Sequence, residues 1–544
     1  MRRWLTLALL AAGPVLVVGL FFVLPVSGMV ARGFWSEGSF DPRGVLEVLM
    51  RPRVARVAWF TVWTAGAATA ISVLLGLPAA FVLHRLALPG RRMIRAALLV
   101  PFVLPTVVVG VAFRLLLGEA GPLGFLGLDG TPVAIVAGLV FFNVAVVIRA
   151  VGAAWESLDV RPAEAAAALG ASPAQVWWTV TLPALRPAIV SAASIVFLFC
   201  ATAFGIVLTL GGVRYATVET EIYLLTTTLF DLQAAAALSV LQLVVVVGLL
   251  GLAARLRATP DATAARSAAR PRRIRPGDVP ALVFTAVVLG VVAAPILTLV
   301  VGSFRTDAGW SLANYRALAG VGSNDALLVP VTEALLTSVR TAVDATCMAL
   351  LTGLAVAVLV TRRSRTRSER RVRGVLDGFF MLPLGVSAVT LGFGFLITLD
   401  RPPVDLRDSA LLVPIAQALV ALPLVVRTLV PVLAGIDDRQ RQAAACLGAS
   451  PWRALLTVDL PVVWKPLLAA SGFAFAASLG EFGATSFLAR DDNPTVPVVI
   501  FRLIGHPGEL NFGMALAASV VLASTTAVVM LAVERLRVPS VGAV

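Results

Sequence analysis

Residues able to perform metal, nucleotide or nucleophilic chemistry are few in this 544-residue chain. The two histidines, His84 and His506, are far apart in the sequence, so an HExxH zinc site or a His-rich metal site is not expected. A phosphate-binding loop of the form GxxxxGK[ST] needs a lysine after glycine, but the single lysine, Lys465, follows Trp464. We therefore expect no catalytic residues, no metal and no cofactor in this chain.

Acidic residues in or beside apolar segments are the remaining candidates, because a charge inside a bilayer is costly unless it is paired or hydrated. Glu481 lies in an apolar segment next to Phe482. Its carboxylate could face a pathway for a cationic solute, or it could bond to the end of a helix. Glu219 and Glu221 precede Tyr223. Together these three could attract a cation through charge and the aromatic face, although a solvated loop or a docking contact for another protein explains them as well.

The composition indicates which elements must position these side chains. The chain is 59% hydrophobic and only 14% charged, with a mean hydropathy of +0.94. Soluble domains carry about 25% charged residues and about 45–50% apolar residues. The chain is thus too apolar for a soluble enzyme or a disordered protein, and we interpret it as a polytopic membrane protein. The net charge of +14 comes largely from arginines between apolar segments, which indicates membrane orientation and not nucleic-acid binding.

Twelve apolar segments are candidates for transmembrane helices, which need about 20 residues each. The first six are residues 5–30, 57–83, 97–117, 133–151, 189–211 and 235–254. The second six are residues 281–302, 335–361, 375–399, 410–430, 467–488 and 513–533. We therefore predict a six-span unit in residues 1–254, an arginine-rich cytoplasmic linker in residues 255–280, and a second six-span unit in residues 281–544. Basic segments at both ends place both termini in the cytoplasm.

The two halves repeat at a constant offset. Gly170 recurs as Gly448, an offset of 278, and Phe204 recurs as Phe482 at the same offset. Further repeated pairs are Asp159/Asp437, Ser172/Ser450, Pro173/Pro451, Pro183/Pro461 and Leu104-Pro105/Leu382-Pro383. An offset maintained over hundreds of residues indicates a tandem duplication with parallel topology.

The loop between the fourth and fifth segments of each half is the most detailed repeated feature. In the first copy Asp159 can cap a short Ala-rich helix, and Gly170 can end it. Ser172 and Gln175, three residues apart, fit a capping box that begins a second helix. Pro183 is expected to end this second helix before the next span. The sequence therefore predicts a helix, a glycine turn and a helix.

This loop resembles the EAA loop of ABC-type importer permeases, which has the form EAA, three residues, Gly, nine residues and I-x-L-P. The first copy matches at Glu164, Ala165, Ala166, Gly170 and Pro183, with Val180 in place of isoleucine. The second copy matches at Ala443, Ala444, Gly448 and Pro461, with Gln442 in place of glutamate. In that family the loop is a coupling helix that docks in a cleft of the ATPase subunit. The resemblance implies two such contacts, made unequal by Gln442.

The resemblance covers nearly the whole chain, and residues 197–223 and 478–485 look like fused permeases that import thiamine. It implies an all-α membrane protein of about twelve transmembrane helices, arranged as two type I importer permease repeats. Thiamine or its phosphates would be delivered by one periplasmic or external binding protein. Two copies of a separate ATPase, holding ATP and Mg²⁺, would drive import across the bacterial inner membrane. The partners would thus be these proteins and membrane lipid, without nucleic acid.

Two alternatives remain open. Ferric-iron permeases are near relatives with similar fused halves, so iron is the second candidate substrate. A proton-coupled secondary transporter also fits twelve spans in two parallel repeats. Carriers of that kind resembling the major facilitator group have an Asp in the basic loop between spans two and three, whereas residues 85–92 are basic without an acid. Intramembrane acids for a proton relay are also scarce, so we favour the importer permease.

Overall fold

The computed structural model describes residues 11–36, 39–212, 214–256, 271–307, 309–362, 366–401, 404–406 and 409–535. The helices of the first half are η1 (Gly19–Val23), α2 (Leu24–Phe34), α3 (Pro42–Met50), α4 (Pro52–Arg85), α5 (Arg91–Ala97), α6 (Leu99–Val103), α7 (Thr106–Leu117), η2 (Gly124–Leu126), α8 (Pro132–Ser157), α9 (Arg161–Ala168), α10 (Pro173–Val176), η3 (Trp177–Thr181), α11 (Leu182–Ala201), α12 (Gly205–Gly211), α13 (Val218–Thr227) and α14 (Leu232–Leu256). Those of the second half are η5 (Pro276–Asp278), α15 (Val279–Ser303), α16 (Ala313–Arg316), η6 (Ala317–Ala319), α17 (Val331–Thr361), α18 (Arg367–Met381), η7 (Leu382–Gly385), α19 (Ala388–Thr398), α20 (Leu412–Ala434), α21 (Asp438–Cys446), α22 (Pro451–Ala454), η8 (Leu455–Asp459), α23 (Leu460–Leu479), α24 (Thr485–Leu488), α25 (Val496–Gly505) and α26 (Glu509–Arg535).

Strands are confined to three two-stranded antiparallel hairpins in the described ranges. They are β1 (Trp35–Ser36) with β2 (Ser39–Phe40), β3 (Arg305–Thr306) with β4 (Gly309–Trp310), and β5 (Asp400–Arg401) with β6 (Val404–Asp405). In the same ranges ten helices are long and apolar enough to cross a membrane, or eleven if one bent pair counts as a span. The all-α membrane class is thus confirmed. Most of the predicted linker, residues 257–270, lies outside the described residues, and the predicted domain boundaries stay a prediction.

The third predicted span of each half, residues 97–117 and 375–399, is wrong as a single helix. In the first half the chain bends by 98° between residues 93–102 and α7. Pro105 stands at this break, and in the second half Pro383 stands in η7 between α18 and α19. Proline has no N–H and its ring clashes with the preceding helical turn, so the repeated Leu-Pro pair interrupts both helices.

The fifth predicted span of each half also has different bounds. The continuous helices are Pro173–Ala201 and Trp452–Leu479, so each begins earlier and ends earlier than residues 189–211 and 467–488. Each is followed by a Phe-Gly pair at which the backbone passes close to another helix. A Cβ on Gly205 would lie 2.4 Å from the Thr106 hydroxyl oxygen at the start of α7, so only glycine fits there.

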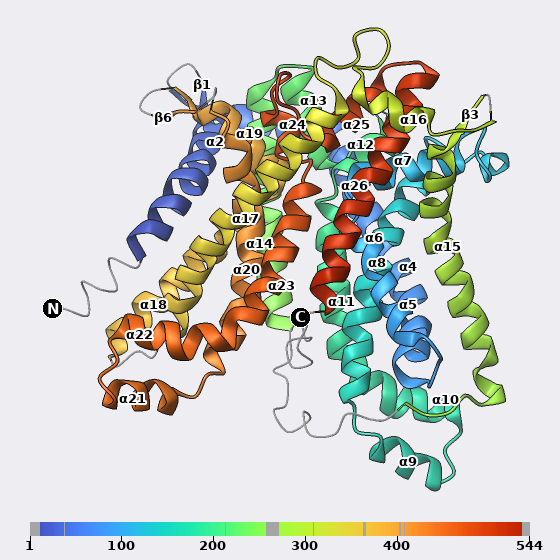
Figure 1. Ribbon diagram of the computed structural model, residues 1–544, viewed down its shortest axis with the longest axis vertical. Helices are drawn as coiled ribbons and strands as arrows, with labels where there is room; N and C mark the ends of the chain where they lie inside the picture. The colour runs from blue at the N-terminus through green and yellow to red at the C-terminus, as the bar shows by residue number, and fades with distance from the viewer. Residues whose placement is uncertain are drawn as a thin grey trace.

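The two halves form two helical groups that exchange their first spans. Helices α4, α8 and α11 pack together in the first half, and α17, α20 and α23 pack in the same way in the second. Helix α2 packs against α19 of the second half, and α15 packs against α4 and α7 of the first half. Figure 1 shows α2 and α15 on opposite flanks of the bundle. The exchange ties the halves into one body.

Aromatic rings meet where the halves join. Phe204 and its repeat partner Phe482 are stacked with ring centroids 5.3 Å apart and an angle of 22° between the ring planes. Tyr223 packs on Phe204 at 5.3 Å, and Phe501, its partner at the same offset, packs on Phe482 at 5.4 Å. The duplication therefore produces a nearly symmetric aromatic cluster in the buried core between the halves.

Candidate functional sites: paired loops, buried acids and a cavity

The first repeated loop folds as a helix, a glycine turn and a helix, as predicted. The Arg161 N–H donates to the Asp159 carboxylate at 3.0 Å, at the start of α9. Gly170 follows the end of α9 with a φ of +88°, a left-handed conformation that favours glycine. Leu169, just before this turn, is 89% exposed. The loop thus presents an apolar side chain at its tip.

The second helix of the loop begins at the predicted capping box. The Gln175 N–H donates to the Ser172 hydroxyl at 3.3 Å, and the Gln175 side chain accepts the Ser172 N–H at 2.7 Å. The prediction that Pro183 ends this helix is wrong. Pro183 lies in the first turn of α11, and the helix runs on through the π-helical turn η3 to Ala201. The wider π turn accommodates the proline ring and its missing N–H, so the loop is continuous with a transmembrane helix.

The second loop repeats these turns. The Asp437 carboxylate accepts the Arg439 N–H at 3.0 Å, and Gly448 has a φ of +81°. Leu447 is 89% exposed, like Leu169. Pro461 again lies at the start of a spanning helix, α23, after the π-helical turn η8, so the expected break is wrong here too. Figure 1 shows α9 and α21 at the same end of the molecule, which we call the loop end.

The loops differ in how ion pairs hold them. In the second loop Arg441 donates to Asp459 at 2.7 Å and to Asp438 at 3.0 Å, and the Asp459 side chain is only 4% exposed. The positions of Arg441 and Asp459 are Ala163 and Thr181 in the first loop. A buried ion pair therefore ties α21 to η8, and the first loop has no counterpart of it among the described residues.

The EAA positions themselves lie on the loop surface. Glu164 and its partner Gln442 are both exposed. Ala165 and Ala443 are exposed, and Ala166 and Ala444 are half-buried. In each short helix the polar EAA side chain thus lies beside small residues, and α21 also exposes Arg439 and Gln440.

Glu481 lies in the turn after α23 and not inside a span. Its carboxylate accepts the N–H groups of Ala484 at 2.8 Å and Thr485 at 3.0 Å, and the residue is 7% exposed. These N–H groups begin the short helix α24, where a carboxylate is favourable. Of the two alternatives for Glu481, the structure therefore shows the bond to a helix end, beside the buried ring of Phe482.

Glu219 and Glu221 are buried, so the expected solvated loop surface is wrong. Glu219, which is 0% exposed, accepts from Gln242 of α14 and from the Ser387 hydroxyl, the latter at 2.9 Å. Ser387 caps α19 of the second half, so Glu219 bridges the halves. Glu221 forms a two-pronged pair with Arg53, at 2.5 and 2.9 Å. The two acids therefore fix α13 against both halves.

Tyr223, one helical turn after Glu219 in α13, belongs to the aromatic cluster. It is half-buried and packs on Phe204 and on Phe487, the latter at 5.4 Å. The structure thus brings Tyr223 and Phe482 into one cluster and keeps the three acids in separate contacts of their own. The five residues therefore do not form one open site that could bind a cation.

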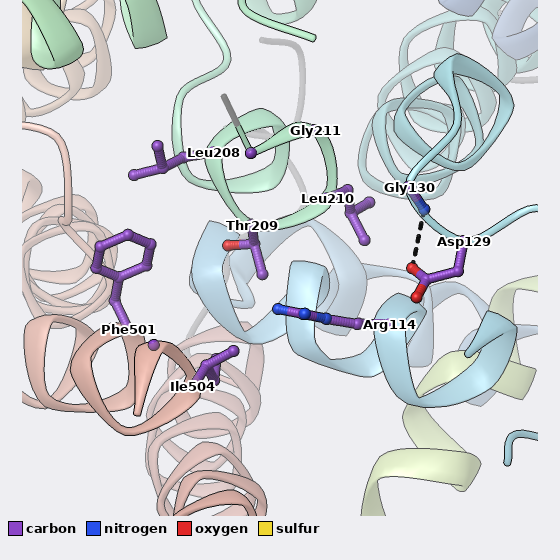
Figure 2. A pocket seen from close by; sticks show the side chains of 11 residues that line it. Arg114, Asp129, Gly130, Leu208, Thr209, Leu210, Gly211, Phe501 and Ile504 are labelled. Atoms are coloured by element: carbon purple, nitrogen blue, oxygen red, sulfur yellow. Dashed lines mark hydrogen bonds between the residues drawn. The ribbon is translucent and has the colours of Figure 1, made fainter. Parts of the chain in front are cut away.

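A cavity of about 270 Å³ lies between α7, α12 and α25. It is lined by Arg114, Asp129, Thr209, Phe501 and Ile504, among others, and Figure 2 shows Arg114 reaching from α7 between Thr209 and Ile504. The Asp129 carboxylate accepts the Gly130 N–H at 3.0 Å on the other side of Arg114. Arg114 was not among the candidate residues predicted from the sequence. An arginine inside an apolar segment was the available signal.

Comparison with known proteins identifies the repeat. Residues 72–258 and 349–537 each match the model of one family, described as "Binding-protein-dependent transport system inner membrane component". The chain belongs to this family. The match confirms the importer permease with two tandem repeats, a non-catalytic membrane subunit, and gives no support to the proton-coupled carrier.

Two relatives match this chain over most of its length, and a third, shorter relative matches about half of it. The chain is 29% identical to the thiamine transport system permease protein ThiP of Brucella abortus, over 83% of this chain and 82% of the relative. It is 28% identical to the ThiP protein of Escherichia coli, over 82% and 83% of the two chains. It is also 36% identical to the molybdenum transport system permease protein ModB of Mycobacterium bovis, over 46% of this chain and 94% of the relative.

Proposed function

We propose that this chain is the permease of an ABC importer for thiamine or its phosphates. Relatives named as thiamine transport permeases match more than four fifths of the chain. ModB, by contrast, matches less than half of it. The full-length similarity to fused permeases therefore supports thiamine over molybdate, and nothing in the structure favours ferric iron.

The coupling role is supported by two similar loops at the loop end of the molecule. Each has a left-handed glycine turn, an exposed leucine and a helix continuous with a span. The second helix of each loop runs without a break into a span, so a movement of that helix would be passed to the core. Two loops call for two ATPase copies, which hold ATP and Mg²⁺ in the cytoplasm. This orientation places both termini in the cytoplasm and a single binding protein at the opposite end.

The candidate pathway residues fall into two roles under this proposal. Phe482 and Tyr223 belong to the ring cluster between the halves, where stacked aromatic faces suit a cationic aromatic solute. Glu219, Glu221 and Glu481 hold the short helices beside that cluster. Movement of the halves apart would separate the stacked rings and open a path, so the acids act by positioning the helices that move.

The test is uptake by lipid vesicles that contain the permease with its cognate ATPase and binding protein. We expect labelled thiamine to enter only with ATP and binding protein, and unlabelled thiamine compounds to compete. Competition by ferric citrate or molybdate, without competition by thiamine, would overturn the substrate assignment. Uptake driven by a proton gradient without ATP would overturn the importer.

A further inference from the structure

Arg114 of α7 faces the cavity between α7, α12 and α25. Arg114 is exposed to this cavity and makes no hydrogen bond or ion pair with any residue in the described ranges. The neighbouring carboxylate, Asp129, bonds to the Gly130 amide instead. A guanidinium whose N–H donors face a cavity can bind an anionic group there, and an arginine within an apolar segment is a candidate functional residue.

The corresponding place in the second half is built from different residues. At the same offset of 278, Arg114 corresponds to Gly392 and Thr209 corresponds to Phe487. A Cβ on Gly392 would lie 3.1 Å from the Phe487 ring, so the ring occupies the space beside this glycine. Phe487 also packs on Tyr223, the counterpart of Phe501. The second half therefore fills the space with rings, and the first half keeps it open and charged.

The lining is suited to a ligand that carries both signs of charge. An arginine guanidinium matches the geometry of a phosphate group. Phe501 offers an aromatic ring, and the Asp129 carboxylate at the rim disfavours a simple anion but suits one that also carries a positive group. The volume, about 270 Å³, is near the lower end of the roughly 300–1,000 Å³ of small-molecule pockets, so it holds part of a molecule.

We infer that this cavity is a substrate subsite in which Arg114 binds the phosphate group of a phosphorylated cationic substrate. The inference rests on the proposed function, in which such a substrate is a thiamine phosphate. Helices α7, α12 and α25, which line the cavity, lie at the end of the molecule opposite the loop end, where a binding protein would deliver the substrate (Figure 1). Phosphate is also present in lipid headgroups, so the test must separate these two sources.

The experiment compares uptake of thiamine and thiamine monophosphate by vesicles that contain the assembled importer. For Arg114→Gln we expect the uptake ratio of monophosphate to thiamine to fall at least about tenfold, because a charged hydrogen bond to phosphate is lost. The matched control is Arg316→Gln, an exposed arginine in α16. This control should leave the ratio unchanged. A second variant, Thr209→Phe, copies Phe487 and should lower the ratio by filling the cavity.

The outcomes separate the two proposals. If the wild-type importer takes up neither compound, the proposed function fails. If it takes up both and Arg114→Gln leaves their ratio as in the wild type, the subsite fails alone. A loss that is equal for both compounds, and that varies with the anionic lipid content of the vesicles, would assign Arg114 to a lipid headgroup and overturn the subsite.

Discussion

The two loops at the loop end share their turns and differ in their ion pairs. Both place a glycine at a positive φ, +88° at Gly170 and +81° at Gly448, directly after an exposed leucine. Only the second loop has the buried pair of Arg441 and Asp459 among the described residues. The duplicated chain thus kept the residues that shape the backbone, and its charged positions diverged. The first loop depends on its caps, and the second has an internal brace as well.

The same contrast recurs in the short helices near the core. Helices α13 and α25 begin alike, since the Val218 N–H donates to Thr61 at 3.0 Å and the Val496 N–H donates to Ser338 at 2.7 Å. Inside α13, Glu221 pairs with Arg53, whereas its counterpart in α25 is Val499. One half therefore uses a buried charge where the other uses an apolar side chain. Substitution of these residues measures how much each charge contributes to stability.

The largest effect is expected from breaking the α13 ion pair. Arg53→Leu leaves the Glu221 carboxylate, 2% exposed, without its partner. We expect the free energy of unfolding to fall by about 3 kcal/mol, measured by thermal or denaturant unfolding in detergent. The double variant Arg53→Leu with Glu221→Val places a valine at residue 221, as α25 has at Val499. It should recover most of the lost free energy of unfolding.

The control for this cycle is Arg56→Leu, an exposed arginine of α4. It should change stability by less than about 0.5 kcal/mol. If the double variant is as unstable as Arg53→Leu alone, the pair of Arg53 and the buried Glu221 is not interchangeable with an apolar contact, and the comparison between α13 and α25 is wrong.

A smaller effect is expected in the second loop. Asp459→Asn removes the charge that holds Arg441, and we expect a local loss of about 1–3 kcal/mol. Hydrogen exchange of the α21 amides should then become faster, and exchange in α9 should stay the same. The matched variant in the first loop, Thr181→Ala, should leave exchange in α9 nearly unchanged. Equal acceleration in both loops would show that the brace is not specific to the second.

Alanine substitutions in the two glycine turns should destabilise both loops by the same amount. Gly170→Ala and Gly448→Ala each force a side chain into a left-handed conformation, at a cost of about 1 kcal/mol. Hydrogen exchange near the turns should show the same local destabilisation in both loops. A cost present in only one loop would contradict the view that the duplication preserved the backbone of both.

The smallest effect is expected at the EAA positions. Glu164→Gln makes the first loop like the second, and Gln442→Glu does the reverse. Because both side chains are exposed, each change should alter ATPase affinity by less than about threefold. Titration of the ATPase onto the permease in vesicles measures this. A loss of more than about tenfold in one variant would show that the exposed carboxylate makes a buried contact in the complex.

Local rules predicted the parts of the structure that depend on neighbours in sequence. Gly170 and the pair of Ser172 and Gln175 act within four residues, and their turns and caps are where the sequence places them. Pro183 did not end its helix, because the π-helical turn before it accommodates the proline ring. Local propensity does not reveal such a turn.

The candidate pathway residues depend on long-range packing and were harder to predict. Glu219 is buried because Gln242 and Ser387 approach it from elsewhere in the chain, and no pattern around residue 219 indicates this. Arg114 lies inside an apolar segment, and the comparison of the halves adds that its counterpart is Gly392. Comparison of the two repeats thus carries more information on the site than either half alone.

Both loops are proposed to couple this permease to ATPase subunits. The most direct measurement is ATPase co-purification and ATP-driven thiamine uptake for the double variant Gly170→Pro with Gly448→Pro, since proline cannot adopt the positive φ of either turn. The control is Gly127→Pro, which disturbs a turn of similar φ, +60°, after η2. We predict that the double variant loses the ATPase and its uptake, while the control retains the ATPase. Normal association and uptake in the double variant would contradict the coupling role of the loops.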